Sequence, residues 1–337
     1  MERSGILCSG AWCVDHNILL DHWPERETVA TIISSQVFGG CPGHNMSTAL
    51  KRLGVPFQVE GQGLIGDDEN GRLLANICDE LGIVRNGLQL RKGIDTSLTY
   101  AVAPVTDGRR THLFQPGSMA LLSPDDFDFS TTTCRIAHMG LPGVNAVMDA
   151  PWQGDASGWV TVLKKARAAG LKTNMELVSI APEKTKAVAE SFLPLLDTLI
   201  INDAEVGAIA GMETVRNSVT NIAACKEAMA KIMAAFPLEM ITVHFPAGGL
   251  VFTRKGEMAE SPSVKVPQAE IKGSNGAGDC FAAGILFGHH EGWPIAQSLK
   301  LAHASAAMSL RSAATTASVA NWKDCLTQAD KWGWRSL

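Results

Sequence analysis

Short apolar runs alternate with longer stretches of mixed apolar and polar residues along most of the chain. The short runs are typical of strands buried in a sheet, and the longer stretches have helical spacing. Val162–Gly170 also closes on a glycine, as helices commonly do. This alternation is typical of a parallel sheet covered by helices. We expect strands at Gly5–Ser9, Gln58–Gly61, Arg135–Met139, Lys172–Met175, Thr198–Ile201 and Met240–His244, and helices at Met46–Leu53, Gly71–Leu81, Gly158–Ala169, Ala181–Phe192 and Asn221–Ala235.

Residues 16–38 and 94–116 break this alternation. They carry β-branched runs that alternate with polar residues, such as Val29–Ile33 and Thr96–Val102. Asp107-Gly108, which follows the second run, is a strong signal for a hairpin turn. We therefore expect small extra strands here, with Val29, Ile32, Leu98 and Tyr100 on exposed apolar faces. Two surface loops rich in β-forming residues would give the same pattern.

Composition restricts the class of protein. The chain has 337 residues, 46% hydrophobic and 19% charged, which is globular rather than disordered. It contains no internal repeat or low-complexity linker, and we expect one α/β domain over residues 1–337. A net charge of −5 argues against binding to nucleic acid or to an anionic membrane surface. No apolar run is long enough to span a bilayer, so we expect neither kind of partner.

The cysteines and the N-terminal residues predict a cytoplasmic location. The first apolar run begins directly after Met1–Ser4 and is too short for the core of a signal peptide. No two cysteines form a Cys-x-x-Cys pair, which indicates reduced thiols that bind no metal. The eight cysteines are Cys8, Cys13, Cys41, Cys78, Cys134, Cys225, Cys280 and Cys325.

The segment around residue 276 carries the strongest chemical signal. Gly276, Ala277 and Gly278 precede an apolar, alanine-rich stretch of helical character. Unpaired backbone amides at a helix start favour an anion, and glycine lets the anion approach closely. Asp279 beside such a site could accept a proton from an attacking hydroxyl group. The alternative is a glycine-rich turn followed by an ordinary acid in the first helical turn.

This segment resembles the C-terminal signature of the ribokinase-like, or PfkB-type, carbohydrate kinases. Five further segments fall in the order of that family's motifs along nearly the whole chain. One is similar to the family's Gly-Gly…Asn…Ala-x-x-Leu-Gly signature, and another to its Asn-x-x-Glu motif. The five are Gly10–Asp15, Gly39–Gly54, Gly63–Gly71, Ile201–Glu205 and Ala302–Ala304.

The resemblance implies a three-layer α/β fold with a mostly parallel central sheet flanked by helices. It also implies a small β-rich lid at 16–38 and 94–116, and a homodimer that shares this lid is one alternative. The implied activity is transfer of the γ-phosphoryl group of ATP, with Mg²⁺, to a hydroxymethyl group of a sugar or sugar derivative. A nucleoside kinase and a catalytically silent sugar- or nucleotide-binding protein of the same fold remain alternatives. A nicotinamide dehydrogenase would need Gly-x-Gly-x-x-Gly after the first strand, where Gly10–Val14 lacks it.

Residue roles follow from the same resemblance. Asp279 is the expected general base, and the amides of Gly276, Ala277 and Gly278 are expected to hold the phosphoryl oxygens. Substrate contacts are expected from Asp15, Gly40 and Asn45, and nucleotide contacts from Asn202, Gly249 and His303. Asn202 and Glu205 are expected to order Mg²⁺ through water, and Asn174 and Glu176 to face the phosphates.

Three of these roles have structural alternatives. Asn45 could cap a helix that begins at Met46, and His303 could be a buried core histidine. Asn202 and Glu205 could form a capping box at a helix start, and this role could coexist with metal binding.

The chain departs from the family pattern at several positions. Gly273 and Ser274 stand where the family commonly has Asp-Thr, and that Asp carboxylate helps to bind a monovalent cation in several members. The run His244–Gly249 keeps only the final glycine of the family's nucleotide motif. Cys13 replaces an Asn that some sugar-binding members carry. Depending on the alignment, Gly39–Cys41 contains an extra glycine or a Gly-to-Cys change.

Overall fold

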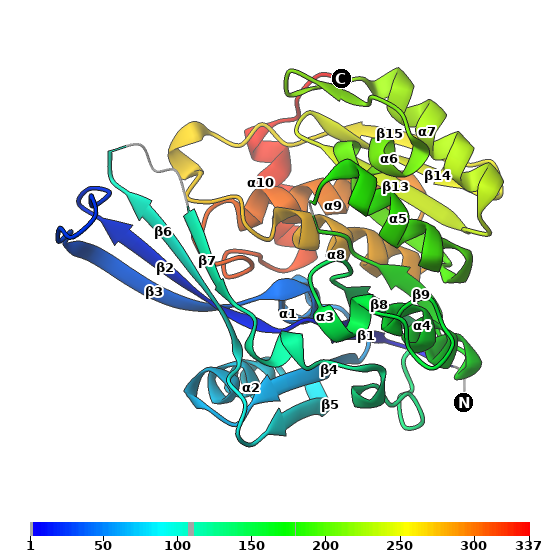
Figure 1. The fold of residues 1–337 in the computed structure, drawn as a ribbon. Helices are drawn as coiled ribbons and strands as arrows, with labels where there is room; N and C mark the ends of the chain where they lie inside the picture. The colour runs from blue at the N-terminus through cyan, green and yellow to red at the C-terminus, as the bar shows by residue number, and fades with distance from the viewer. Residues whose placement is uncertain (1–2, 107–110, 179) are drawn as a thin grey trace.

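A mostly parallel sheet forms the centre of the molecule (Figure 1). The computed structural model describes residues 3–106, 111–178 and 180–337. Within them the sheet has nine strands, and only β14 and β15 run antiparallel to their neighbours. The short apolar runs form these strands because both faces of the sheet are covered. In sheet order the strands are β5 (Val84–Arg91), β4 (Val59–Gly66), β1 (Ile6–Gly10), β8 (Ile136–Gly140), β9 (Lys172–Met175), β10 (Thr198–Asn202), β13 (Met240–Phe245), β14 (Gly248–Thr253) and β15 (Met258–Pro262).

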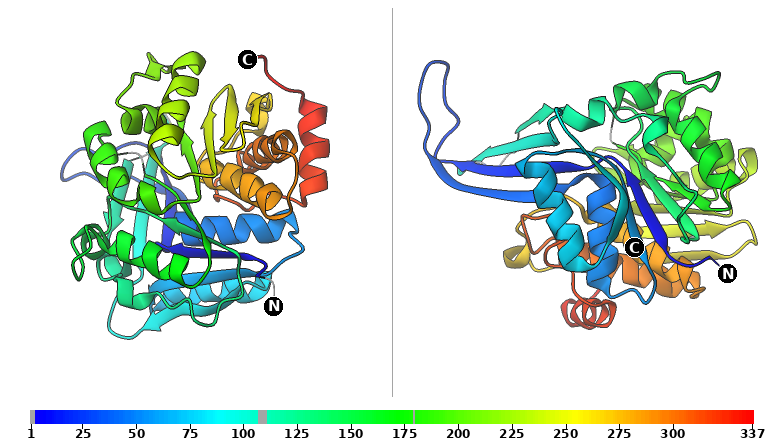
Figure 2. Two further views of the ribbon diagram at one scale, coloured as in Figure 1. Left: turned by 90° about the vertical axis from the view of Figure 1, so that its right-hand side faces the viewer. Right: turned by 90° about the horizontal axis from the view of Figure 1, so that it is seen from below.

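Helices cover both faces of this sheet and bury two separate apolar cores, so the predicted three-layer α/β fold is confirmed (Figures 1 and 2). Four short 3-10 turns lie at Gly117–Ala120, Pro124–Asp126, Leu193–Leu195 and Gln268–Glu270. One core contains side chains of α1 (Cys41–Leu53), α2 (Glu69–Leu81), α8 (Ala277–His290), α9 (Ile295–Ser309) and α10 (Trp322–Trp332); the other contains side chains of α3 (Ala146–Asp149), α4 (Gly158–Ala168), α5 (Pro182–Phe192), α6 (Asp203–Ala210) and α7 (Ile222–Ala235).

A second, four-stranded sheet projects from the main body in the order β3-β2-β6-β7 (Figure 1). It confirms the extra strands predicted at 16–38 and 94–116, and we call it the lid sheet. The predicted hairpin turn at Asp107-Gly108 lies outside the described residues, but the strands on either side of it pair antiparallel. The lid strands are β2 (Cys13–Leu20), β3 (Ile32–Gly40), β6 (Ser97–Pro104) and β7 (Thr111–Gln115); β11 (Val215–Arg216) and β12 (Val219–Thr220) form a separate small hairpin.

Two details of the lid prediction are wrong. Val29–Thr31 lies outside the strands because β3 begins only at Ile32. Leu98, expected on an exposed face, is buried at the base of the lid sheet and packs with the core beneath α1 and α2.

Helix α1 begins at Cys41 rather than at the predicted Met46, with Gly40 at its N-cap. The hypothesis that Asn45 caps the helix is therefore wrong, because Asn45 lies inside it. Pro42 is tolerated in the first turn, where its missing N–H would have no helical partner. Cys41 has a φ of 69°, a backbone conformation that favours glycine. This favours the alignment in which Cys41 replaces the second glycine of the family's pair.

No helix in the described ranges is long and apolar enough to cross a membrane.

Candidate active site

The polar residues singled out in the sequence gather at the carboxyl ends of the parallel strands. Glu176 directly follows β9 and Asn202 ends β10. Ligands of open α/β sheets bind at this edge, where connecting loops leave room between strands. Asp279 lies in the first turn of α8, which approaches the same edge (Figure 1).

The start of α8 is shaped by glycine. Gly276, the N-cap, has a φ of 76°, and an added Cβ would lie 2.6 Å from the Cβ of Thr315. Other residues would therefore strain the turn. The N–H of Ala277 donates to the carbonyl oxygen of Ser274 at 3.3 Å. An added Cβ at Gly278 would meet only the His244 ring, at 3.7 Å, so this side of the turn faces a cavity.

Asp279 is buried, and its two carboxyl oxygens have different surroundings. Oδ2 accepts a hydrogen bond of 2.9 Å from Nδ2 of Asn45. Oδ1 is buried without a hydrogen-bond partner among the described residues. Oδ1 of Asn45 accepts in turn from the Thr315 hydroxyl group, at 2.7 Å. Asn45 therefore holds the carboxyl group in place and leaves one oxygen available to a ligand.

A chain of polar side chains runs from Thr198 through Asn174 and His138 to the carboxyl group of Glu176. The hydroxyl group of Thr198 donates to Oδ1 of Asn174 at 2.9 Å, and Nδ2 of Asn174 lies 2.8 Å from Nδ1 of His138. Because an amide nitrogen only donates, Nδ1 must accept and Nε2 carries the proton. That Nε2 then donates to Oε2 of Glu176 at 3.2 Å. Burial lowers the pKa of His138 to about 4, so the ring is neutral.

Both carboxyl groups hold a proton more tightly than exposed acids do. Burial raises the pKa of Glu176 to about 7. Burial and the neighbouring Glu176 raise the pKa of Asp279 well above its ordinary value, because two adjacent charges would repel in a poorly solvated site. A carboxylate with a raised pKa is a stronger base, which suits proton abstraction from a hydroxyl group.

Asp15 and Gly40 lie together where the lid sheet joins the main body. Cys13 and Gly40 are paired across β2 and β3, and an added Cβ at Gly40 would lie 2.4 Å from Oδ2 of Asp15. The Cys13 thiol donates to Oδ1 of Asp15 at 3.6 Å. Gly40 is thus required for the close approach of this carboxylate to the start of α1.

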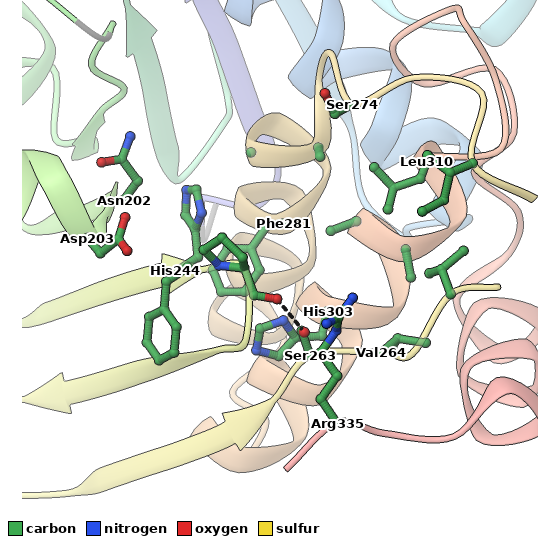
Figure 3. Close-up of a pocket in the computed structure, with 18 of the residues that line it drawn as sticks. Asn202, Asp203, His244, Ser263, Val264, Ser274, Phe281, His303, Leu310 and Arg335 are labelled. Atoms are coloured by element: carbon green, nitrogen blue, oxygen red, sulfur yellow. Dashed lines mark hydrogen bonds between the residues drawn. The ribbon is translucent and has the colours of Figure 1, made fainter. Parts of the chain in front are cut away.

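A cavity of about 550 Å³ begins at the amides of α8 and extends along α9 (Figure 3). Its size is in the range of cofactor and nucleotide sites. His303 lines it, and its ring packs against Phe281 at 5.0 Å between centroids, as does His244. Burial lowers the pKa of His303 to about 3 and that of His244 to about 4, so both rings are neutral. Gly249 lies behind His303, because a Cβ added to Gly249 would lie 3.1 Å from Nε2 of His303. Gly249 does not line the cavity.

Asn202 and Glu205 form a capping box at the start of α6. Oδ1 of Asn202 accepts from the N–H of Glu205 at 2.9 Å, and Oε2 of Glu205 accepts from the N–H of Asn202 at 3.0 Å. Both residues also line a second cavity of about 140 Å³, together with Glu176 and Gly278. The structural alternative is therefore present, and the side chains still face a site.

This second cavity fits Mg²⁺ held mainly by water and phosphate. Its carboxylate and amide oxygens are the hard donors that Mg²⁺ prefers. The described residues contain no group of three or more His, Cys, Asp or Glu placed to hold a metal by themselves. Mg²⁺ commonly keeps several waters and shares substrate phosphates, so a direct protein cage is unnecessary.

The family profile described as pfkB family carbohydrate kinase matches residues 5–322. The chain belongs to the pfkB family of carbohydrate kinases. A 5-dehydro-2-deoxygluconokinase of Shouchella clausii is 26% identical over 315 residues, which cover 91% of this chain and 90% of that protein. A 1-phosphofructokinase of Rhodobacter capsulatus is 27% identical and covers 82% of this chain and 81% of its own. This pfkB-family kinase is thus a phosphotransferase that acts on sugars.

Solved structures show the same fold. A ribokinase of Arabidopsis thaliana, solved with ribose and ATP, matches with a TM-score of 0.77 at 18% identity, over 98% of this chain and 99% of its own. A nucleoside kinase of Methanocaldococcus jannaschii matches with a TM-score of 0.76 at 17% identity and the same coverage.

Sequence reasoning missed several residues that shape the site of this pfkB-family kinase. His138, Thr198 and Thr315 make the hydrogen bonds that fix Glu176 and Asn45. Thr315 lies in a run of alanine and threonine without any motif, so no local signal indicated it. His138 sits in the apolar strand β8, and its histidine was the one available signal.

Proposed function

We propose that this pfkB-family kinase transfers the γ-phosphoryl group of ATP to a hydroxymethyl group of a sugar or sugar derivative. The observation that carries the proposal is the unpartnered Oδ1 of the buried Asp279, beside the open face of Gly278. Matches to curated sugar kinases over most of the chain support a sugar as acceptor. The scattered, unpaired cysteines of the sequence support a reducing compartment, so the cytoplasm is part of this proposal.

In this proposal ATP occupies the 550 Å³ cavity, with its phosphates at the start of α8. The hydroxyl group of the acceptor lies against Oδ1 of Asp279 and loses its proton to that oxygen as it attacks the γ-phosphorus. The bond between the γ-phosphorus and the oxygen that bridges it to the β-phosphate breaks, and ADP leaves with that oxygen. Asn45 keeps the carboxyl group oriented during the transfer. The amides around Gly278 and the positive end of α8 stabilise charge on the phosphoryl oxygens. Asp15 and the nearby Gly40 contact hydroxyl groups of the acceptor at the base of the lid sheet.

Mg²⁺ would be held through water by Glu205 and Asn202, with Glu176 in the same cavity. It would neutralise charge between the phosphates of ATP. The three residues would orient its water molecules.

ATP consumption measured against a panel of sugars, sugar derivatives and nucleosides tests the proposal. We expect turnover with a sugar, and a fall of about a hundredfold or more in kcat for Asp279→Asn, the scale of losing a general base. ATP affinity and melting temperature should stay near those of the parent. Turnover with nucleosides and with no sugar would show that the acceptor is a nucleoside. A kcat of Asp279→Asn within a few-fold of that of the parent would show that Asp279 is not the general base.

We also propose that two copies associate through the outer face of the lid sheet. Val37, His16, Tyr100 and Leu113 are paired across all four strands and therefore share one face. The Leu113 side chain is 57% exposed and Val37 42% exposed, which is unusual for a row of apolar residues on a sheet. Leu113→Lys should shift the mass measured by light scattering from dimer to monomer. Met258→Lys, at a 71% exposed methionine on the edge strand β15, is the matched control.

A further inference from the structure

The C-terminal segment, residues 333–337, runs along the edge of the cavity of about 550 Å³ in which we place ATP. Val264 and Trp334 form an antiparallel bridge. The N–H of Lys265 donates to the carbonyl oxygen of Gly333, and the N–H of Arg335 to that of Ser263, both at 2.8 Å. Residues 333–335 thus pair with residues 263–265, the segment that follows β15. This pairing places Arg335 beside the cavity.

Side chains fix this segment to the body of the protein. Nε1 of Trp334 donates to Oδ1 of Asp330 at 3.0 Å, and the Lys300 ammonium group lies 5.2 Å from the centroid of the Trp334 ring. The same ammonium group pairs with Asp330 at 3.2 Å. At the end of the chain, Leu337 packs against Gly248 of β14. The position of Arg335 is therefore set by several independent contacts.

Arg335 lines the cavity with Ser263, Val264 and His303, whereas Ser274 marks the opposite end near the start of α8 (Figure 3). Its guanidinium group makes no hydrogen bond or ion pair within the described residues. The two histidines of the cavity wall are neutral, because burial lowers their pKa values. Arg335 is consequently the one charged cation among the described residues that line this cavity.

On the basis of the proposed function, we propose that Arg335 binds the purine nucleoside of the phosphoryl donor and not its phosphates. Guanidinium has five N–H donors and no acceptor. Ring nitrogens and ribose oxygens supply the matching acceptors, and the face of a purine can pack against the planar cation. The phosphates are expected at the other end, where the amides of α8 begin. Neither the family signature nor the sequence motifs include this C-terminal residue.

Calorimetric titration with adenosine and with ADP tests the assignment in Arg335→Ala, Arg335→Lys and the parent. We expect Arg335→Ala to weaken both ligands by the same factor, about tenfold, as for loss of one charge-assisted or cation–π contact. Arg335→Lys should recover part of the loss. Lys331→Ala, at an exposed lysine of α10 outside the cavity wall, is the control and should bind like the parent. Melting temperatures should agree, since the guanidinium group has no partner among the residues that the structure describes.

Two results would overturn the assignment: parent-like adenosine binding in Arg335→Ala, or a loss confined to ADP, which would place the contact on phosphate. Kinetics separate this test from the proposed function. Arg335→Ala should raise the KM for ATP while leaving kcat and the acceptor KM unchanged. Sugar phosphorylation with an unchanged KM for ATP would defeat only the assignment of Arg335. Absence of phosphotransfer in the parent, with adenosine binding still dependent on Arg335, would defeat only the proposed function.

Discussion

At the scale of single residues, the site holds two carboxyl groups that the fold has taken largely out of water. Asp279 is 8% exposed, and Glu176, beside it, has 21% of its side chain exposed. Each would be more stable when protonated, yet catalysis requires one of them as a base. Bound Mg²⁺ and the amides of α8 would supply the positive potential that restores the charged form. The protein therefore accepts a less stable empty site in exchange for a carboxylate that is charged, and able to accept a proton, when the site is filled.

The burial of Glu176 should make the unfolding free energy depend on pH. Burial raises the pKa of Glu176 from 4.5 to about 7, so its contribution to stability is present below pH 4.5 and is lost as pH rises through about 7. Glu176→Gln removes the charge and retains an acceptor for Nε2 of His138. Relative to the parent, the variant should gain about 2 kcal/mol in unfolding free energy between pH 5 and pH 8. Urea denaturation at both values measures this.

The control for that experiment is Glu183→Gln, at an exposed acid on α5. We expect its stability to follow the parent across the same range. If the unfolding free energies of Glu176→Gln and the parent change equally with pH, the pKa of Glu176 is not raised by burial.

The glycine at position 273 leads us to predict that K⁺ does not activate the enzyme. Related kinases use an Asp at this place in the motif to help bind such a cation, whereas Gly273 offers only its backbone, and its N–H donates to the carbonyl oxygen of Leu310 at 3.2 Å. Without the carboxylate, few anionic oxygens remain to replace a hydration shell. Initial rates in K⁺, Na⁺ and a bulky organic cation at equal ionic strength should agree within about twofold. A several-fold, saturable rise with K⁺ alone would show that backbone carbonyls suffice.

At the scale of elements, one short motif serves both the helix and the site. The capping box of Asn202 and Glu205 satisfies two amides at the start of α6 while both side chains face the 140 Å³ cavity. Glu205→Gln keeps an oxygen for the N–H of Asn202 but removes the charge. We expect it to raise the Mg²⁺ concentration for half-maximal activity several-fold, with an unchanged melting temperature.

Glu205→Ala is the matched comparison. It removes the capping oxygen as well and should also lower the unfolding free energy by about 1 kcal/mol. If Glu205→Gln titrates with Mg²⁺ like the parent and only Glu205→Ala is affected, the motif serves the helix alone.

The same scale shows what the sequence can predict. Lys172–Met175 was predicted with its true bounds because it is a short segment between two helical stretches, where the alternating pattern requires a strand. The first turn of α1 was missed because Pro42 and Gly43 are typical of a turn, although both fit a helix start. Strand β4 was predicted too short because Gly63 and Gly66 look like strand breakers. Trp12 fills the space over Gly63, where an added Cβ would lie 2.7 Å from the indole ring.

At the scale of the whole molecule, the site depends on contacts that no local pattern contains. Asn45 and Asp279 are 234 residues apart, and Asn45 and Thr315 are 270 residues apart. The motifs predicted that Asn45 and Asp279 each belong to a site, whereas their hydrogen bond follows only from the packing of α1 against α8. Thr315 belongs to no motif, and its contact with Asn45 follows from the fold alone. The cavity of about 550 Å³ has the same origin, because residues of β13, α8, α9 and the C-terminal segment all line it. Arg335 in particular had no sequence signal.

The lid sheet is the part of the molecule that we expect to respond to substrate. It joins the main body through Gly39 and Gly40, and Nδ2 of Asn17 reaches across to the carbonyl oxygen of Ala313 at 3.2 Å. Its far end is solvated, with Val29 87% exposed and Ile33 55% exposed (Figure 2). Closure over an acceptor would remove water from the attacking hydroxyl group and from Asp279.

Hydrogen exchange with and without the phosphorylated sugar product, at saturating ADP, measures this closure. Amides of β2, β3 and β6 should exchange at least about tenfold more slowly in the complex, because closure adds contacts to a sheet whose edge strand β3 is now mostly exposed. Amides of α4, on the far face of the central sheet, should be unchanged and provide the internal control. Equal protection of the lid strands in both states, with product shown to be bound, would mean that the lid sheet is a fixed wall and that its exposed face serves association alone.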